Sequence, residues 1–524
     1  MMITQKKLHL ATALILAVFY LFLLVYQSEK VAITDDARFY MTAAKKYAAY
    51  FENCKFTKNC HKDSTIKKYW TENHEHPPFA KLLMASGYIV FHKKLGWLDE
   101  IRALRIGISI FAAIVLLFLF SFVYRAFSFH AAVFSSLFFI FLPRTFFHAR
   151  VATLDFAVAG MSFIFVYSYW RSLSSKKWGW LTGIIFGIAI STKLNAPFMV
   201  VPVLAHYIYV KKDLLMKKPV KTIFAPQFVS MLLFSMPVFF ILWPWLWHDT
   251  FKRFAEYVMF HTNHYGILMY YLGDVFSEPR PQWHAPMVMM LLTTPIITLF
   301  FSFAAPVVYK WKKENNNFHA MMLVLLSAFV SIAVLMFLPA PFYSGVKLFQ
   351  PFFPFLAILA GVGLYSVLKN VTLIPEKYRF APAVLFFLPV IFSMIDLKHD
   401  HLSYFNEVAG GTKGASKLKI ERQYYDLYYY ELTEFFNKAC KKKRCRVHFE
   451  PNGKEYGPSA GILKKADYLT KKYIDSKPEI ANYLVLTHEY RWRNYPFLLR
   501  NYKFMKKVFT LKRQGVELVT VFKM

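Results

Sequence analysis

The chain has 524 residues, of which 56% are hydrophobic and 19% aromatic, and its mean hydropathy is +0.32. This composition excludes an ordinary soluble domain, because several apolar runs are long enough to cross about 30 Å of hydrocarbon. The net charge of +33 does not indicate nucleic-acid binding, because the basic residues lie in loops between apolar runs and no nucleic-acid motif is present. The basic loops fit the positive-inside rule, attraction to anionic membrane lipids, or a field that collects a phosphate-bearing lipid substrate.

Eleven apolar segments are predicted to span the membrane. The first has no small-residue cleavage site after it, so we expect it to be retained. The predicted spans are residues 8–27, 103–124, 131–148, 152–170, 178–192, 197–210, 226–243, 286–309, 320–338, 348–367 and 382–396. Lys and Arg in the short loops predict a cytoplasmic N-terminus, with residues 28–102, 244–285 and the tail from 397 outside. We expect a polytopic α-helical membrane domain over residues 1–396 and a small extracytoplasmic α/β domain over 397–524.

The first outer loop begins with two adjacent carboxylates, in the stretch "VAITDDARFY". A carboxylate beside a bilayer is costly, so Asp35 and Asp36 are candidate functional residues. Thr34 or Asp35 could instead cap the helix that follows. Arg38 could form an ion pair with Asp35 on the surface of that helix. These alternatives stay open from the sequence alone.

Further polar segments are expected on the same outer side. They are "ENHEHPPFAKLL", "PRTFFHARVATLD", "STKLNAPF", "WPWLWHDT" and "PFYSGVKLFQPFFPF". Carboxylates can act as general bases, and Arg, Lys and His can hold a phosphate leaving group. Asp155 could also form an interfacial pair with Arg150, and Lys193 could extend to the lipid headgroups. Their shared placement favours group transfer from a lipid-linked phosphate at the outer surface.

The tail is polar and rich in Lys and Tyr. "YYDLYYYELTEFFNKAC" is predicted to form an amphipathic helix, and "ANYLVLTH" a strand. "KKVFTLKRQGVELVTVF" is predicted to form a hairpin that turns at Gln514–Gly515. We therefore expect a small α/β domain.

All four cysteines fall in predicted outer segments. Cys54 lies near Cys60, and Cys440 lies near Cys445. Each pair could close a small disulfide loop in an oxidising compartment. A zinc knuckle is the alternative, but neither pair has the two-residue spacing or the His partners of such a site.

The order of these motifs resembles that of a known family. "TDDARFYMTAA" resembles the Asp-Asp/Glu motif of the protein O-mannosyltransferase and lipid A aminoarabinose transferase families, and "HEHPPFAKLL" resembles their segment before a Pro pair. "FHARVATLDFAVAG", "STKLNAPF" and "WPWLWHDT" fit the same pattern, and "HLSYFNEVAGGTKGA" resembles a tail signature of bacterial members. The likeness covers most of residues 1–415. It implies a GT-C integral-membrane glycosyltransferase that uses a polyprenyl-phosphate sugar donor and inverts the anomeric centre.

The resemblance also implies roles for single residues. Asp35 would be the catalytic base toward the acceptor, and Asp36 would position the acceptor or a neighbouring group. Arg38, His76 and Lys193 would bind the donor phosphate, although His76 stands where aminoarabinose transferases have a Lys and a His is not always charged at neutral pH. Three further residues would support the site: Glu75, Asp155 and Arg150.

Several alternatives remain at this level. A membrane transporter or lipid flippase would place charges near mid-bilayer in two similar halves, and neither feature is visible here. An oligosaccharide ligase or an assembly protein would leave the Asp-Asp loop less well explained. No cofactor is specified, but Glu75, His74 and His264 could bind a divalent metal, Zn²⁺ or Mg²⁺. The acceptor could be lipid A, another glycan or glycolipid, or a protein, and the expected location is a bacterial inner membrane with a periplasmic tail.

Overall fold

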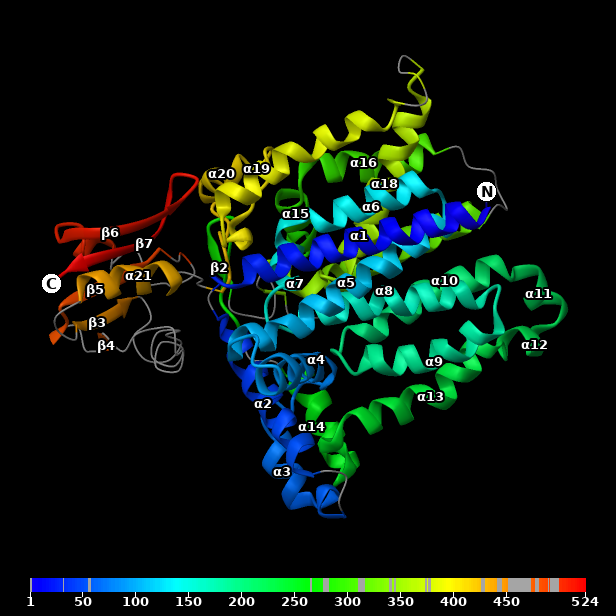
Figure 1. The fold of residues 1–524 in the computed structure, drawn as a ribbon, viewed down its shortest axis with the longest axis horizontal. Helices are drawn as coiled ribbons and strands as arrows, with labels where there is room; N and C mark the ends of the chain where they lie inside the picture. Colours follow the sequence, from blue (N-terminus) through cyan, green and yellow to red (C-terminus); the bar gives the residue numbers. More distant parts are fainter. Residues whose placement is uncertain are drawn as a thin grey trace.

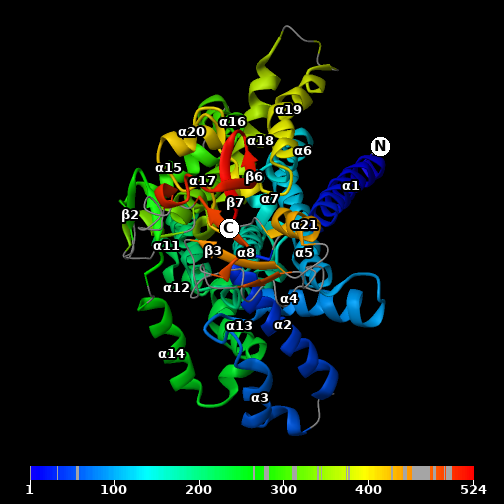
Figure 2. The same cartoon turned by 90° about the vertical axis from the view of Figure 1, so that its left-hand side faces the viewer.

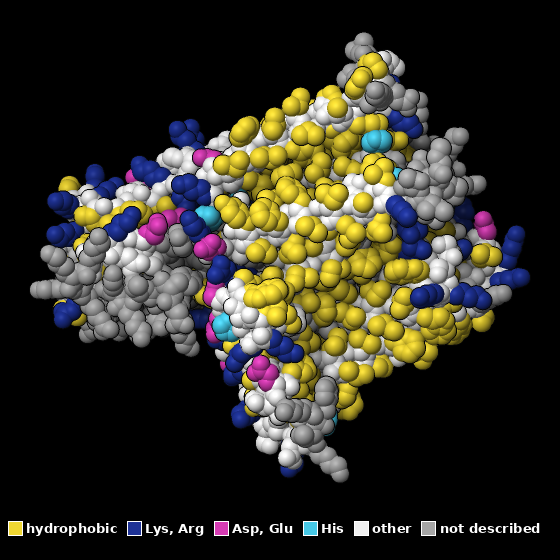
Figure 3. Space-filling view, viewed as in Figure 1, with side chains coloured by type: hydrophobic (Ala, Val, Ile, Leu, Met, Phe, Trp, Pro, Cys, Tyr) yellow, Lys and Arg dark blue, Asp and Glu magenta, His cyan; other side chains and the backbone are white. Residues whose placement is uncertain are grey.

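The transmembrane part is a bundle of helices, and the C-terminal domain lies beyond one end of it (Figure 1). A computed structural model of the protein describes residues 2–31, 33–54, 58–263, 266–276, 282–309, 316–338, 342–343, 345–372, 375, 378–425, 429–440, 445–450, 473–475, 480–488, 490 and 499–524. Figure 3 shows a broad hydrophobic surface over the bundle, with Lys and Arg gathered at its two ends. This distribution is the one expected of a protein whose middle is surrounded by lipid.

Thirteen helices of the described part build the bundle. They are α1 (Met2–Ser28), α5 (Glu100–Ala126), α6 (Phe129–Ile140), α7 (Pro143–Ala149), α8 (Asp155–Ser172), α9 (Lys176–Ile190), α10 (Val200–Val210), α13 (Pro226–Leu242), α15 (Ala285–Thr293), α16 (Ile296–Val308), α17 (Asn316–Phe337), α18 (Phe352–Asn370) and α19 (Leu388–Leu397). Among the described residues, 4 helices are long and apolar enough to cross a membrane, or up to 6 if each bent pair is one span. The polytopic class is therefore confirmed, whereas the number of eleven spans stays a prediction.

Two predicted spans are sharply bent. Residues 131–148 form α6 and α7, which meet at 76°, and residues 286–309 form α15 and α16, which meet at 112°. Each of these predicted spans is therefore a bent pair of helices. Each bend has a proline, since Pro143 begins α7 and Pro295 immediately precedes α16. Proline lacks the N–H of a continuing helix and disfavours the helical conformation of the residue before it.

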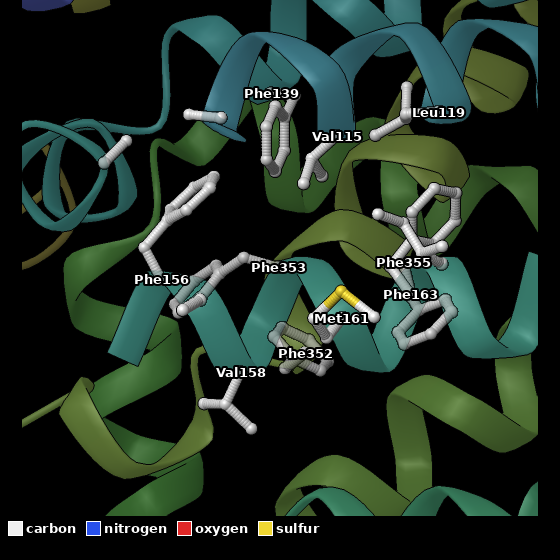
Figure 4. Packing of buried hydrophobic residues seen from close by; sticks show 14 of the residues in the cluster. Val115, Leu119, Phe139, Phe156, Val158, Met161, Phe163, Phe352, Phe353 and Phe355 are labelled. Atoms are coloured by element: carbon white, nitrogen blue, oxygen red, sulfur yellow. The ribbon is translucent and has the colours of Figure 1, made fainter. Parts of the chain in front are cut away.

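Figure 4 shows how the middle of the bundle is filled. Phe156 and Met161 of α8 lie in one hydrophobic cluster with Val115 of α5 and Phe353 of α18. Gly160 permits the close approach of α8 to α5, because a Cβ there would lie 2.6 Å from the ring of Phe111. This packing fixes the start of α8, and with it Asp155, relative to the outer ends of its neighbours.

Shorter elements cover the outer end of the bundle. They are α2 (Asp35–Cys54), α3 (Asp63–Trp70), α4 (Phe79–Gly87), α14 (Thr250–Thr262), α20 (Gly411–Lys417) and a hairpin of β1 (Met269–Tyr271) and β2 (Asp274–Phe276). Figure 2 shows α2, α3 and α14 extending to one side of the C-terminal sheet. The two outer loops are joined directly, because Arg253 of α14 donates to Asp63 of α3 at 2.6 Å. At the opposite end lie α11 (Lys212–Lys217) and α12 (Pro219–Ile223).

The C-terminal domain is a five-stranded sheet covered by one described helix. The strand order is β4-β3-β5-β7-β6, in which β3 is parallel to β4 and β5 while β7 is antiparallel to β5 and β6. The elements are α21 (Tyr429–Ala439), β3 (Cys445–Glu450), β4 (Tyr473–Asp475), β5 (Tyr483–Thr487), β6 (Lys506–Arg513) and β7 (Val516–Lys523). The predicted α/β character and the hairpin at Gln514–Gly515 are confirmed. The helix predicted over residues 424–440 was too long at its start, because Tyr424 and Tyr425 have non-helical backbone and precede α21.

The disulfide prediction holds for one pair of cysteines. Cys440 and Cys445 are bonded and join the end of α21 to the start of β3. The prediction was wrong for Cys54 and Cys60, which are both buried and are not joined by a disulfide. The Cys60 thiol points at the carbonyl oxygen of Cys54 at 2.8 Å, so it satisfies a carbonyl at the end of α2 that has no helical partner.

Candidate functional site

The candidate site begins where α2 starts, at the outer end of α1. The Thr34 hydroxyl accepts a hydrogen bond from the Ala37 backbone N–H at 3.1 Å, so Thr34 is the N-cap of α2. Asp36 follows in the first turn of α2, and its carboxylate contacts residues outside this helix. The side chain of Asp35 lies outside the described residues, and its predicted role as base stays a prediction.

Asp36 contacts two residues from distant parts of the chain. Its Oδ2 atom accepts from the Nζ of Lys347, which stands at the start of a short 3-10 segment, Lys347–Phe349, before α18. The same oxygen accepts from the Tyr425 hydroxyl at 3.0 Å. Asp36 keeps 29% of its side-chain surface exposed, whereas Lys347 keeps 8%. The pair thus lies at the boundary between the packed interior and the outside.

A second buried pair lies beside the first. Asp155 at the start of α8 accepts from Lys193 Nζ at 2.9 Å. Tyr425 lies between the two pairs, since its hydroxyl is also 3.5 Å from Asp155 Oδ2. His148 Nδ1 lies 3.7 Å from that oxygen. Two carboxylates and two ammonium groups therefore alternate in one cluster, which spares each the cost of an unpaired buried charge.

The charge state of Lys347 follows from this arrangement. Burial disfavours its ammonium form, but the carboxylates of Asp36 and Asp155 outweigh burial and raise the pKa of Lys347 above its ordinary value. Lys347 thus remains a cation over the physiological range. It supplies a fixed positive charge that could hold a phosphate.

His76 lies among further cationic groups. Its Nδ1 atom is buried and has no hydrogen-bond partner among the described residues, and its ring lies 5.1 Å from that of His261. Burial lowers the pKa of His76 well below its ordinary value, and nearby His261, Lys193 and Lys81 lower it further. The imidazole is therefore neutral, and Nδ1 is a polar atom that can still form a hydrogen bond.

The turn that carries His76 is built around a buried lysine. The Lys81 ammonium donates to the Asn73 carbonyl at 2.6 Å and to the His76 carbonyl at 2.8 Å. Burial lowers the pKa of Lys81 to about 7, although Glu75 and Glu72 counteract this. The turn therefore holds its lysine through carbonyl oxygens, which fixes the backbone on both sides of the Glu75–His76 pair.

Two predicted site residues lie outside this cluster. Arg150 does not pair with Asp155. Its guanidinium donates to the Gln27 carbonyl at 3.1 Å, the His399 carbonyl at 2.8 Å and His401 Nδ1 at 2.8 Å. Arg150 thus joins the end of α1 to the segment after α19, and its support of the site is indirect. The Arg38 guanidinium lies over the Phe39 ring, 4.7 Å from the centroid.

The predicted metal ligands are also separated. Glu75 accepts from the Asn73 amide at 2.6 Å, and the His74 ring packs against Trp245 with centroids 4.6 Å apart. Within the described ranges, no group of three His, Cys, Asp or Glu side chains could hold a metal ion. His264 lies outside the described residues, so a metal site that includes it stays a prediction.

Sequence reasoning did not assign three members of the cluster. Lys347 carries a usable signal, because a single lysine at the outer start of an apolar span is a candidate functional charge. His148 lies within a segment that was singled out, but a lone His there had no specific partner. Tyr425 carries no local signal, since its partner Asp36 is 389 residues away in the sequence.

The sequence matches a family model over residues 75–243, which describes dolichyl-phosphate-mannose-protein mannosyltransferases. This segment contains Glu75, His76, Asp155 and Lys193. A search of curated protein sequences gives no significant match. The match over residues 75–243 thus covers five members of the predicted site, since it also contains Arg150.

Solved structures show the fold. The apo oligosaccharyltransferase of Archaeoglobus fulgidus superimposes with a TM-score of 0.51 at 10% identity, over 98% of this chain and 74% of that one. ArnT of Cupriavidus metallidurans, bound to undecaprenyl phosphate, gives a TM-score of 0.46 at 15% identity, over 99% and 98% of the two chains. The fold assignment rests on the oligosaccharyltransferase rather than on ArnT. The predicted resemblance to the mannosyltransferase family is confirmed by the family match over residues 75–243, and the superposition shows a fold shared with the oligosaccharyltransferase.

Proposed function

We propose that the protein is a glycosyltransferase that moves a sugar from a polyprenyl-phosphate donor to an acceptor at the outer face of the membrane. The observation that carries this proposal is the cluster of Asp36, Lys347, Asp155 and Lys193, which pairs two carboxylates with two cations at the outer end of the bundle. Asp155 and Lys347 are buried, whereas Asp36 and Lys193 are partly exposed. Such a cluster combines acids for the acceptor with cations for a phosphate. The family match over residues 75–243 supports the same class of donor.

The proposed reaction is a single inverting displacement. An acceptor hydroxyl or amine attacks the anomeric carbon, and the bond from that carbon to the phosphate oxygen breaks. Asp35 takes the proton of the acceptor, while the electron pair leaves with the polyprenyl phosphate. Lys347, Lys193 and His76, in the tautomer that carries its proton on Nδ1, stabilise the negative charge that develops on the phosphate. Asp36 orients Lys347, with which it is paired.

We also propose that the enzyme lies in a bacterial inner membrane with its C-terminal domain in the periplasm. The Cys440–Cys445 disulfide supports an oxidising compartment on that side. The basic loop at α11 and α12, at the opposite end of the bundle (Figure 3), supports a cytoplasmic location for that end. The donor lipid would then lie in the membrane while the acceptor arrives from outside.

A donor panel tests this function. Purified protein in nanodiscs would be incubated with several polyprenyl-phosphate sugars and a membrane extract as acceptor, and free polyprenyl phosphate would be measured by mass spectrometry. We expect release from at least one donor only when the acceptor is present. Movement of a donor between leaflets without release would instead identify the alternative, a lipid flippase. If no donor released polyprenyl phosphate, the result would contradict the proposal.

A further inference from the structure

The C-terminal domain is joined to the candidate site by the segment of residues 421–425. We propose that Tyr425 is a positioning residue of the active site, and that the C-terminal domain maintains this position. The inference rests on the proposed function, because it concerns the same reaction. It extends that function, because the C-terminal domain would then be needed to hold an active-site residue in place.

Tyr425 contacts both carboxylates of the candidate site. Its hydroxyl lies 3.0 Å from Asp36 Oδ2 and 3.5 Å from Asp155 Oδ2, so one group bridges both carboxylates. Its ring also lies 5.4 Å from Lys347 Nζ. Burial, with the charges of Asp36 and Asp155, raises the pKa of Tyr425 well above its ordinary value. The hydroxyl therefore keeps its proton and acts as the donor to the carboxylate.

The preceding residue strengthens the assignment. The hydroxyl of Tyr424 lies 2.7 Å from His148 Nε2, and His148 Nδ1 faces Asp155 at 3.7 Å. Tyr425 thus contacts both carboxylates directly, and Tyr424 contacts the imidazole that lies next to Asp155. A side chain that only filled space would not need both hydroxyl groups directed at this network.

The segment before the tyrosines is held by the C-terminal domain. Arg422 donates to the Glu517 carbonyl of β7 at 2.8 Å. Gln423 donates to Asp400 Oδ2 at 3.2 Å, and Asp400 lies 4.0 Å from Arg513 of β6. Residues 422 and 423 are therefore tied to the sheet immediately before the chain enters the site.

The tip of the β6–β7 hairpin supplies a second attachment. Gln514 Oε1 accepts from the Thr412 backbone N–H at 2.8 Å and from its hydroxyl at 3.0 Å. A Cβ at Gly411 would lie 2.6 Å from that oxygen, so the glycine leaves room for the contact. The hairpin is thus docked at the start of α20, on the same stretch of chain that leads to Tyr425.

Substitution of one hydroxyl tests the positioning role. Tyr425→Phe removes only the hydroxyl that contacts Asp36 and Asp155, and we expect kcat to fall about 10- to 100-fold because hydrogen bonds to charged groups are strong. The KM for the donor should change little, because Lys347 and Lys193 remain. Tyr404→Phe is the matched control, since Tyr404 lies on the same tail segment and its buried hydroxyl has no hydrogen-bond partner among the described residues. Full activity in both variants would overturn the inference, as would a Tyr425→Phe effect confined to KM.

A double-mutant cycle tests the link to the domain. Gln514→Ala removes the hairpin contact, which is remote from Asp36, and should lower kcat by itself. In the Tyr425→Phe background the same change should cost little more, because both act through one hydroxyl. Losses that multiply would show that the domain acts independently of Tyr425 and would overturn this part of the inference. Wild-type release of polyprenyl phosphate is measured alongside, so failure of the proposed function itself is recognised separately.

Discussion

Removal of the lysine charge beside Asp36 should weaken catalysis strongly. In Lys347→Met the side chain keeps its length and its packing beside Tyr425, but Asp36 loses its ammonium partner. A hydrogen bond between charged groups contributes about 1.5–3 kcal/mol, and each 1.4 kcal/mol corresponds to about tenfold. Only 8% of the Lys347 side chain and 29% of the Asp36 side chain are exposed, so water screens this pair weakly. We therefore expect kcat/KM to fall about 10- to 100-fold.

The assay is release of polyprenyl phosphate from the preferred donor, with kcat and KM determined separately. Lys45→Met is the matched control, because Lys45 also lies on the outer side and pairs with Glu100 at 2.6 Å. That pair is 39% and 43% exposed, and exposed pairs contribute only about 0–1 kcal/mol. Equal activity of the Lys347→Met and Lys45→Met proteins, with both folded, would refute the proposed role of Lys347.

Three further predictions concern stability and covalent state. Arg150→Met should lower the melting temperature by removing its bonds to three carbonyl or ring acceptors, while activity per folded molecule changes much less. Burial raises the pKa of Asp400 to about 7, so the folded state keeps the Asp400 proton up to a higher pH than the unfolded state does. The free energy of unfolding should therefore fall as pH rises from about 4 to 7. Asp400→Asn should flatten that dependence in melting curves. Alkylation with mass spectrometry should find Cys440 and Cys445 protected until reduction, and the other two cysteines reactive after unfolding without reductant.

The membrane class and the outer motifs are predictable because they rest on local patterns. Long apolar runs determine the bundle, and the Gln514–Gly515 pair between alternating residues determines the hairpin that forms. The helix cap at Thr34 was one of two open alternatives, and the structure selects it. Sequence also placed Asp155 and Lys193 on the same side, where they form an ion pair.

The contacts that complete the site are not local. Asp36, Lys347 and Tyr425 meet only because the bundle and the tail fold together, and no spacing along the chain encodes their distance. The bends at Pro143 and Pro295 had a visible proline signal, but a hydrophobic run alone does not distinguish a straight span from a bent one. The predicted disulfide between Cys54 and Cys60 was wrong for a similar reason, because the orientation of the two thiols depends on how α2 ends.

The proposed mechanism depends most on the adjacent carboxylates of α2, which can be replaced one at a time. Asp35→Asn and Asp36→Asn proteins would be compared with wild type for release of polyprenyl phosphate, with folding verified by melting temperature. We expect Asp35→Asn to lower kcat by about 10²–10⁴-fold, because a general base is lost, and Asp36→Asn to cause a smaller loss. Full turnover by a folded Asp35→Asn protein would contradict the proposed mechanism.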